Sequence, residues 1–438
     1  MERTPERPDV THTPSDAARV SALRSVRRTY YFVTSLTWFG NVLPMAIGVL
    51  FVQSRGFSLL DVGLFTGIYA LTVALLEVPT GGLADTIGRK RVAMLAGALA
   101  MASSAMLLVT FSLPMLLAYA VVFGASRALG SGALEAWFVD AQQAIEPDVD
   151  LQPPFAMAGT FELFALAAGT LLGGFLPTWF AHLPTIEGHI VSPLATPILA
   201  SLGVKLLALV AILTLVRETP TEGAKTSYGH VFRDAVALTR GNGIVLALLG
   251  VSAASGFLVA GLETFWQPFF AARLGGGAEK TWLFGVIMAG SFGAGMLGNL
   301  LAIPMSRWLG RRHARVAALF HALQLAAVLA LAFTKVVPAA VALFWIAYLA
   351  MGGSGSPIAA LFNGAVPGNR RSVMLSVRSL AGFAGAFLGS VVLGWVAESA
   401  SIQAAWTIAG GSTVLSVVLL LHMDRRSRPA PASHPSVS

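Results

Sequence analysis

The sequence predicts an all-α integral membrane protein with twelve membrane-spanning helices arranged in two bundles of six. Three observations support this prediction: the composition, the number of long apolar runs and the distribution of basic residues. Of the 438 residues, 55% are hydrophobic and 11% are charged, and the mean hydropathy is +0.73. A soluble domain usually has about 25% charged residues. The chain therefore has too few polar side chains to cover a soluble fold of this size.

Twelve apolar runs are long enough to cross the hydrocarbon core of a bilayer, which requires about 20 residues in a helix. Strands are excluded because unpaired backbone cannot lie in lipid outside a closed barrel, and these runs lack the short alternating segments of barrel strands. We expect the helices at about 30–52, 60–81, 92–112, 115–140, 155–178, 195–216, 244–272, 281–303, 314–334, 339–363, 374–396 and 402–423.

The basic residues give the orientation of these helices. Four of the 29 Lys and Arg residues fall on the predicted outer loops: Arg55, Arg273, Lys280 and Lys335. This asymmetry predicts that both termini are cytoplasmic and that the protein is a multi-pass protein of the plasma or inner membrane. Residues 1–29 lack an apolar segment, so they are not a cleavable signal peptide. We expect them to form a disordered cytoplasmic tail.

A polar segment near the middle of the chain divides the helices into two groups. We expect a first bundle at 30–217, a cytoplasmic linker at 218–243, a second bundle at 244–423 and a tail at 424–438. Part of the linker, HVFRDAVALTR, can form an amphipathic helix on the membrane surface. A shift of 222 residues places Gly310, Arg311 and Arg312 on Gly88, Arg89 and Lys90. Such a weak internal repeat is typical of secondary transporters.

The stretch EVPTGGLADTIGRKRV separates the second and third predicted spans. Gly81 permits close approach of another helix backbone, and Gly88 permits a tight reversal. Asp85 lies at the C-terminal end of its own helix, where an acid is unfavourable, so we expect it to face the N-terminus of another helix. The basic residues Arg89 and Lys90 face water, lipid headgroups or nearby acids. The simpler alternative is that they only hold the loop inside.

The segment GGLADTIGRKR resembles the loop between the second and third helices of the major facilitator superfamily, with Thr86 in place of the usual basic residue. The twelve spans, the central linker and the repeat extend the resemblance over nearly the whole chain. It implies that Asp85 faces the start of the eleventh helix, which carries Arg378. Asp140, at the inner end of the fourth span, is the expected partner of Arg89. We hypothesise that Gly81, Asp85, Gly88, Arg89, Lys90, Asp140 and Arg378 form an inner latch between the bundles.

Charged residues within the predicted spans are costly and usually functional. Arg127 lies in the fourth span at a place where the family often has an arginine connected with proton coupling. Glu135 follows it, about 80° around a continuous helix, and Glu162 lies in the fifth span. We identify these three residues as proton-coupling candidates. The alternatives are a structural ion pair for Arg127 and, for Glu135, contact with the inner surface beside Asp140.

The seventh span contains an acid followed by aromatic and amide side chains. This pattern suits a cationic or amphipathic ligand, and the resemblance implies that the first and seventh helices line a central cavity. We therefore expect the substrate to contact Asn41, Glu263, Trp266 and Gln267. Glu263 could instead lie at the outer edge, and the aromatic residues could face lipid. Two further charges are less informative: we expect Lys205 to reach the outer surface, and the sequence does not decide the role of Glu77.

The fifth span contains ALAAGTLLGG, which resembles an element of drug–proton antiporters with Thr170 in place of a proline. The alternative is that its glycines only allow close helix packing. The resemblance implies a transporter that exports an amphipathic or drug-like molecule in exchange for protons. Proton-linked uptake of a small nutrient is the alternative. No metalloprotease, P-loop or dinucleotide pattern occurs, so we do not expect an enzyme. Because the chain has no cysteine and its histidines are scattered, we expect no metal or cofactor. We expect the protein to contact membrane lipids, its substrate and protons, and not to bind nucleic acid. We expect a monomer.

Overall fold

The computed structural model describes residues 16–184, 190–218, 239, 241–275, 277–367 and 370–426. Six side chains in its helices lie outside this description, those of Val78, Pro79, Gly81, Gly82, Asp85 and Ser372. The described residues form helices and turns without any strand. The amphipathic helix expected in the linker lies outside the described residues.

The helices follow the predicted order. The first half contains α1 (Asp16–Val42), η1 (Leu43–Ala46), α2 (Gly48–Gln53), α3 (Leu59–Ile87), α4 (Arg89–Leu108), α5 (Leu113–Gly130), α6 (Ala133–Gln143), α7 (Gln152–Trp179), η2 (Pro193–Ala195) and α8 (Thr196–Leu215). The second half contains α10 (Gly243–Leu274), η3 (Ala278–Lys280), α11 (Thr281–Trp308), α12 (His313–Phe333), α13 (Val337–Ala365), α14 (Arg371–Ser399) and α15 (Ile402–Arg426).

Eleven segments of the described chain are long and apolar enough to cross a membrane. The remaining predicted span, 30–52, is divided among α1, η1 and α2, where Pro44 stands in the short 3₁₀ segment. A proline inside a helix removes a hydrogen bond and interrupts the turn. The expected disordered tail at 1–29 is wrong for residues 16–29, because these residues are the first half of α1 and Leu23 is buried there.

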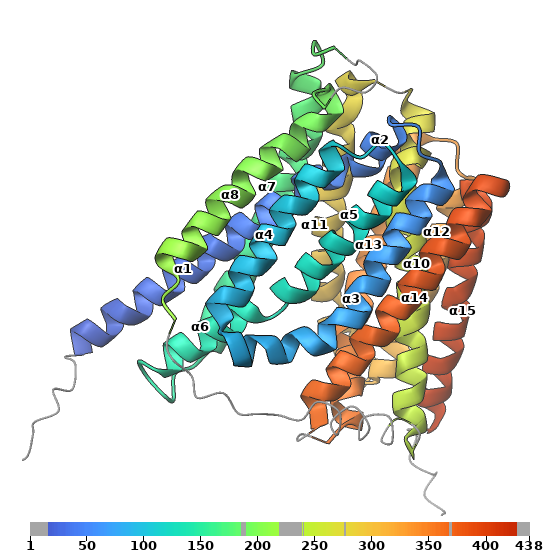
Figure 1. Ribbon diagram of the computed structural model, residues 1–438. Helices are drawn as coiled ribbons and strands as arrows, with labels where there is room; N and C mark the ends of the chain where they lie inside the picture. The colour runs from blue at the N-terminus through green and yellow to red at the C-terminus, as the bar shows by residue number, and fades with distance from the viewer. Residues whose placement is uncertain are drawn as a thin grey trace, which may run out of the picture.

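The two ends of the bundle differ. We call the end at which α1 begins and α15 ends the terminal face, and the opposite end, where α2 lies, the far face (Figure 1). Within the first half α1 packs on α7 and α8, and α4 packs on α5 and α8. Within the second half α10 packs on α14 and α15, and α13 packs on α11 and α12. The halves meet where α3 crosses α14 and where α7 crosses α11.

One hydrophobic core joins the two halves at the far face, whereas each half has its own core at the terminal face. The shared core contains, among others, Ile47, Val49, Phe51 and Leu116 of the first half and Phe265, Trp266, Phe269 and Phe344 of the second. The core at the terminal face of the first half contains Tyr30, Val92, Phe138 and Ile212. Its counterpart in the second half contains Val245, Ala314, Phe362 and Leu420. The halves are therefore held together by apolar packing at the far face.

Candidate functional site

The fourth span is interrupted in the middle of the bundle. The helix α5 ends at Gly130 and α6 begins at Ala133, and between them Gly132 takes the left-handed conformation with φ 77°. A glycine is the residue that adopts this conformation without strain. Our expectation of one continuous helix at 115–140, with an 80° angle between Arg127 and Glu135, is therefore wrong. The prediction failed because the apolar run continues through a sequence, Gly-Ser-Gly, that turns the backbone.

This break creates two helix ends that favour opposite charges. Arg127 lies in the last turn of α5, and Glu135 lies in the first turn of α6. A cation is stabilised at a helix C-terminus and an anion at a helix N-terminus, by roughly 0.3–1 kcal/mol each at exposed positions. Both side chains are exposed to solvent. The break therefore helps to hold two charges within a segment that is otherwise apolar.

Arg127 lies near one aromatic ring of the first half and within electrostatic range of two further helices. Its guanidinium carbon lies 5.8 Å from the ring centre of Trp38 on α1, a distance that permits a cation–π interaction. It also interacts electrostatically with Glu162 on α7 and with Tyr69 on α3. Glu162 is half-buried and is close enough to Glu135 for the two carboxylates to repel each other. The structure thus brings together the three proton-coupling candidates.

Glu263 on α10 is the corresponding charge of the second half. Its side chain is exposed to solvent although it lies deep in the bundle. Tyr348 on α13 lies beside it, and the two side chains interact electrostatically. Tyr69 interacts electrostatically with Arg127 and also with Glu263, so it lies within range of charges in both halves. We call the group of Arg127, Glu135, Glu162, Tyr69 and Glu263 the central site.

One helical turn beyond Glu263 the far face is sealed. Trp266 is 2% exposed, and its ring packs near Phe284 and Phe344 with centroid distances of 5.8 and 5.7 Å. Gln267 is 3% exposed. Asn41, the remaining cavity candidate, is partly buried near the end of α1. Of the four cavity candidates, Glu263 is therefore the one that the structure places at a solvent-exposed position.

The side chain of Gln267 satisfies backbone groups of the interrupted first span. Its Oε1 accepts hydrogen bonds from the backbone amides of Val49 (2.9 Å) and Leu50 (3.2 Å), and its Nε2 donates to the carbonyl of Met45 (2.8 Å). Backbone groups without a partner are costly in a membrane. Gln267 therefore connects the second half to the first half at the far face.

The glycines of the antiporter-like element are packing positions. A Cβ atom on Gly173 would lie 1.9 Å from the carbonyl oxygen of Leu43, and one on Gly174 would lie 2.6 Å from Cα of Gly285. Gly169 is similarly close to Phe39 and Val42 of α1. These glycines let α7 approach the interrupted first span on one side and α11 of the other half on the opposite side.

The residues predicted to form the latch lie at the terminal face. Arg89 forms an ion pair with Asp140 at 2.9 Å, which is the pairing that the sequence predicted, and it lies within the first half. Lys90 donates to the carbonyl of Leu213 at 2.8 Å. Gly88 forms the reversal between α3 and α4 with φ 97°. Arg378 packs on the ring of Phe362 within the second half, 5.6 Å from its centre. The side chains of Gly81 and Asp85 lie outside the described residues.

Two further charges occupy unexpected positions. Lys205 does not reach the surface: it is 6% exposed, and its Nζ donates to Ser104 Oγ at 2.7 Å and to the carbonyl of Ala100 at 3.4 Å. The expectation failed because α4 supplies neutral acceptors within hydrogen-bond reach. Glu77, whose role the sequence left open, accepts a hydrogen bond of 2.8 Å from Ser379 Oγ on α14. That bond joins the two halves.

Sequence reasoning did not single out Trp38, Tyr69 or Tyr348. A signal was present, because the chain has six tyrosines and a tyrosine within an apolar span requires a partner for its hydroxyl. The identity of that partner depends on helix packing. Among the described residues no group of three or more His, Cys, Asp or Glu side chains could hold a metal ion.

Comparison with known proteins supports the fold. A sequence model described as the Major Facilitator Superfamily matches residues 30–357 and 292–437. The crystal structure of the nucleoside transporter NupG is similar, with a TM-score of 0.73, 15% identity and coverage of 91% of this chain and 98% of that chain. No curated protein matches the sequence.

Two further solved structures share the fold. One is a bacterial homologue of the human lysosomal transporter Spinster in an inward-facing and unoccupied conformation, with a TM-score of 0.64, 17% identity and coverage of 94% of this chain and 96% of that chain. The other is the human organic anion transporter MFSD10, with a TM-score of 0.57, 19% identity and coverage of 93% and 100%.

Proposed function

Because this chain belongs to the major facilitator superfamily, we propose that it is a secondary active transporter that exports a small amphipathic or drug-like molecule in exchange for protons. The observation that supports the proposal most is the central site, in which Arg127, Glu135 and Glu263 are exposed to solvent within apolar spanning segments. Charges at membrane depth are usually found where ions or substrates pass. Alternating access would expose this site to each side of the membrane in turn.

Glu162 is the proposed proton carrier. Glu162 interacts electrostatically with one anion, Glu135, and one cation, Arg127, so its charge state depends on the positions of both. A small displacement of Arg127 during the transport cycle would therefore change the protonation of Glu162. Substrate and proton could compete for the same site in this arrangement.

Glu263 is the proposed contact for a positively charged group of the substrate. Its carboxylate lies beside Tyr348 and near Tyr69, and aromatic faces attract cations. Trp38, which already faces Arg127, would supply apolar contact area. This combination suits a molecule that carries both a cationic group and an aromatic or aliphatic body.

The separate cores at the terminal face and the shared core at the far face support an assignment of this structure to one end state of the cycle. If both termini are cytoplasmic in the cell membrane, as we propose, this state is inward-facing. We also propose that the monomer is sufficient for transport. Single cysteines at residues 16 and 426 can test the orientation, because the chain has no native cysteine. Labelling of the two positions from opposite sides of the membrane would contradict it.

The experiment that tests the function is flux into reconstituted vesicles with an internal pH dye and a panel of cationic amphipathic compounds. We expect substrate-dependent proton movement in the natural protein. Glu162→Gln should abolish proton movement while substrate exchange at equal concentrations continues. Glu263→Gln should raise the KM for cationic compounds without uncoupling the protons. Glu279→Gln, at an exposed position in η3, is the control.

Proton-linked uptake of a small nutrient is the second candidate, because a nucleoside transporter, NupG, shares the fold. The same vesicles distinguish the two functions. An imposed proton gradient should drive substrate against its own gradient, in the direction opposite to proton flow for an exchanger and in the same direction for an uptake transporter. Proton movement that persists in Glu162→Gln would contradict the role of Glu162 in either case.

A further inference from the structure

The first half of α1 extends beyond the rest of the bundle at the terminal face (Figure 1). This segment, residues 16–29, carries four arginines, Arg19, Arg24, Arg27 and Arg28. We call it the basic arm. It lies outside the central site, and the transport function proposed above does not use it.

Two of these arginines bond to the protein. Arg27 Nε donates to Gln142 Oε1 at 2.8 Å, which holds the arm against α6. Arg19 lies 3.1 Å from Asp16 and 3.9 Å from Glu146. These contacts occupy one side of the arm.

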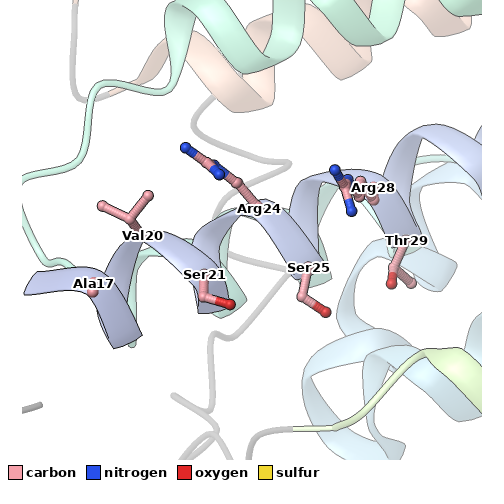
Figure 2. Close-up of a pocket in the computed structure, with 7 residues that line it drawn as sticks. All are labelled: Ala17, Val20, Ser21, Arg24, Ser25, Arg28 and Thr29. Atoms are coloured by element: carbon pink, nitrogen blue, oxygen red, sulfur yellow. The ribbon is translucent and has the colours of Figure 1, made fainter. Parts of the chain in front are cut away.

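The other two arginines, Arg24 and Arg28, are exposed and form no hydrogen bond or ion pair with the described part of the chain. They are four residues apart, so they lie on the same side of the helix. Ser21, Ser25 and Thr29 lie on the neighbouring strip of the helix surface. Together with Ala17 and Val20, these five residues line an open recess of about 520 Å³ along one face of α1 (Figure 2).

The chemistry of this recess is that of an anion site with several donors. Two guanidinium groups offer planar pairs of N–H donors, which match the oxygens of a phosphate. Three hydroxyl groups add further donors and acceptors. In the described residues no acidic side chain lines the recess.

The position along α1 indicates where the anion comes from. The apolar part of the first span begins at Tyr30, and a helix rises by about 1.5 Å per residue. Arg28 therefore lies about 3 Å before this point along the helix axis, within the headgroup layer of a bilayer, and Arg24 lies about 9 Å before it, at the outer edge of that layer. A phospholipid headgroup is thus held at the recess by the membrane itself.

We propose that Arg24 and Arg28, with Ser21 and Ser25, form a binding site for the phosphate group of an anionic phospholipid at the terminal face. The lipid fixes the arm at the membrane surface, while Arg27 fixes it to α6 and Arg19 pairs with Glu146, just after α6. The arm is part of α1, and the same helix carries Trp38, which lies near Arg127. The lipid site is therefore connected to the central site through one continuous helix.

The test measures binding of short-chain phosphatidylglycerol, phosphatidylcholine and inorganic phosphate to the full-length protein in detergent. We expect phosphatidylglycerol to bind more tightly than phosphatidylcholine, and inorganic phosphate to bind weakly. The double variant Arg24→Gln/Arg28→Gln should weaken phosphatidylglycerol binding about twenty-fivefold, since a basic residue at an anionic surface contributes roughly fivefold in affinity. Its thermal unfolding should be unchanged because both side chains are exposed.

The matched control is Arg19→Gln/Arg27→Gln, which removes the same charge from the other side of the same helix. It should keep the affinity for phosphatidylglycerol within about twofold to threefold. Equal losses in both double variants would overturn the proposal in favour of diffuse charge attraction. Equal binding of phosphatidylcholine and phosphatidylglycerol would also overturn it. So would binding of inorganic phosphate as tight as that of phosphatidylglycerol, because the site would then be one for soluble anions.

Discussion

The far face and the terminal face are formed by opposite ends of the same helices, yet they are held together in different ways. At the far face the halves share one hydrophobic core and are connected by the bonds of Gln267. At the terminal face each half has its own core and its own ion pair, Arg89–Asp140 in the first half and Arg312–Asp424 in the second. Contacts at the terminal face thus stabilise each half separately.

This difference indicates which contacts must change for the far face to open. The cores and ion pairs within each half can persist through such a movement. The contacts to be broken are the Gln267 bonds and the close helix crossings at Gly63–Gly394 and Gly174–Gly285. Substitutions at the far face should therefore affect the conformational equilibrium more than substitutions at the terminal face.

The largest effect is expected for Gly174→Ala. The added Cβ would lie 2.6 Å from Cα and N of Gly285, and backbone atoms can give way only if α7 and α11 separate. We expect a destabilisation of about 1–3 kcal/mol, as for overpacking in general, and at least a tenfold loss of transport. Thermal unfolding in detergent and vesicle flux measure the two effects.

Gly159→Ala is the matched control for this substitution, because Gly159 lies in the same helix and a Cβ there has no neighbour within 4 Å. It should leave transport unchanged and leave stability unchanged or raised by about 0.5–1 kcal/mol, since alanine is the better helix former. If Gly174→Ala behaved like Gly159→Ala, the crossing at Gly285 would not hold the far face closed.

The second effect concerns Gln267→Leu, which removes the partners of two backbone amides and one carbonyl in the interrupted first span. Leaving a buried donor or acceptor unpaired costs about 1–3 kcal/mol, and opening of the far face to water relieves this cost. We expect a cysteine at Ala46, which is 0% exposed, to be labelled at least tenfold faster from the far side. Gln324→Leu, in a helix of the second half and 2% exposed, is the control and should leave the rate unchanged.

The sequence predicted the helices well because crossing a membrane imposes a minimum length of apolar residues. It also predicted the Arg89–Asp140 pair, because the cations before the third span can face acids at the inner end of the fourth. The breaks at Pro44 and Gly132 were not predicted. Run length does not report them, because both breaks lie inside continuous apolar sequence.

The contacts of the central site were harder to predict, because they join residues that are distant in sequence. Glu263 and Tyr348 lie on α10 and α13, and Lys205 finds its acceptors on α4. The sequence identified the charges as costly but not the neutral groups that accommodate them. Similarly, the aromatic and amide residues after Glu263 would fit either the wall of a cavity or a buried core. Which of the two they form depends on whether the halves are closed at the far face.

A third prediction concerns the hydrogen bond between Glu77 and Ser379, which joins the halves between the two faces. We expect Ser379→Ala to cost about 0.5–1.5 kcal/mol, the usual net contribution of one hydrogen bond. In a double-mutant cycle with Glu77→Gln, the two effects should be coupled by a similar amount. Thermal unfolding of the natural protein, the two single variants and the double variant provides the cycle. Additive effects of the two substitutions would indicate that this bond does not stabilise the contact between α3 and α14.

The smallest effect is expected at the terminal face, for the proposed latch. In this structure Arg89 and Asp140 are bonded within the first half, with side chains that are 20% and 24% exposed. A partly exposed ion pair contributes about 0–1 kcal/mol. If Asp85 closes the latch in the opposite state, Asp85→Asn should shift the equilibrium towards the open terminal face by a similar amount, which is at most about fivefold in population.

A cysteine at Ser131, an exposed position in the break between α5 and α6, can report this shift through its labelling rate from the terminal side. We expect the rate to rise about twofold to fivefold in Asp85→Asn and to remain unchanged in Asp148→Asn, which removes an exposed acid from the same face. An equal response of the two variants would show that Asp85 acts only through the net charge of the face. In that case the terminal face would have no latch, and its closure would depend on packing alone.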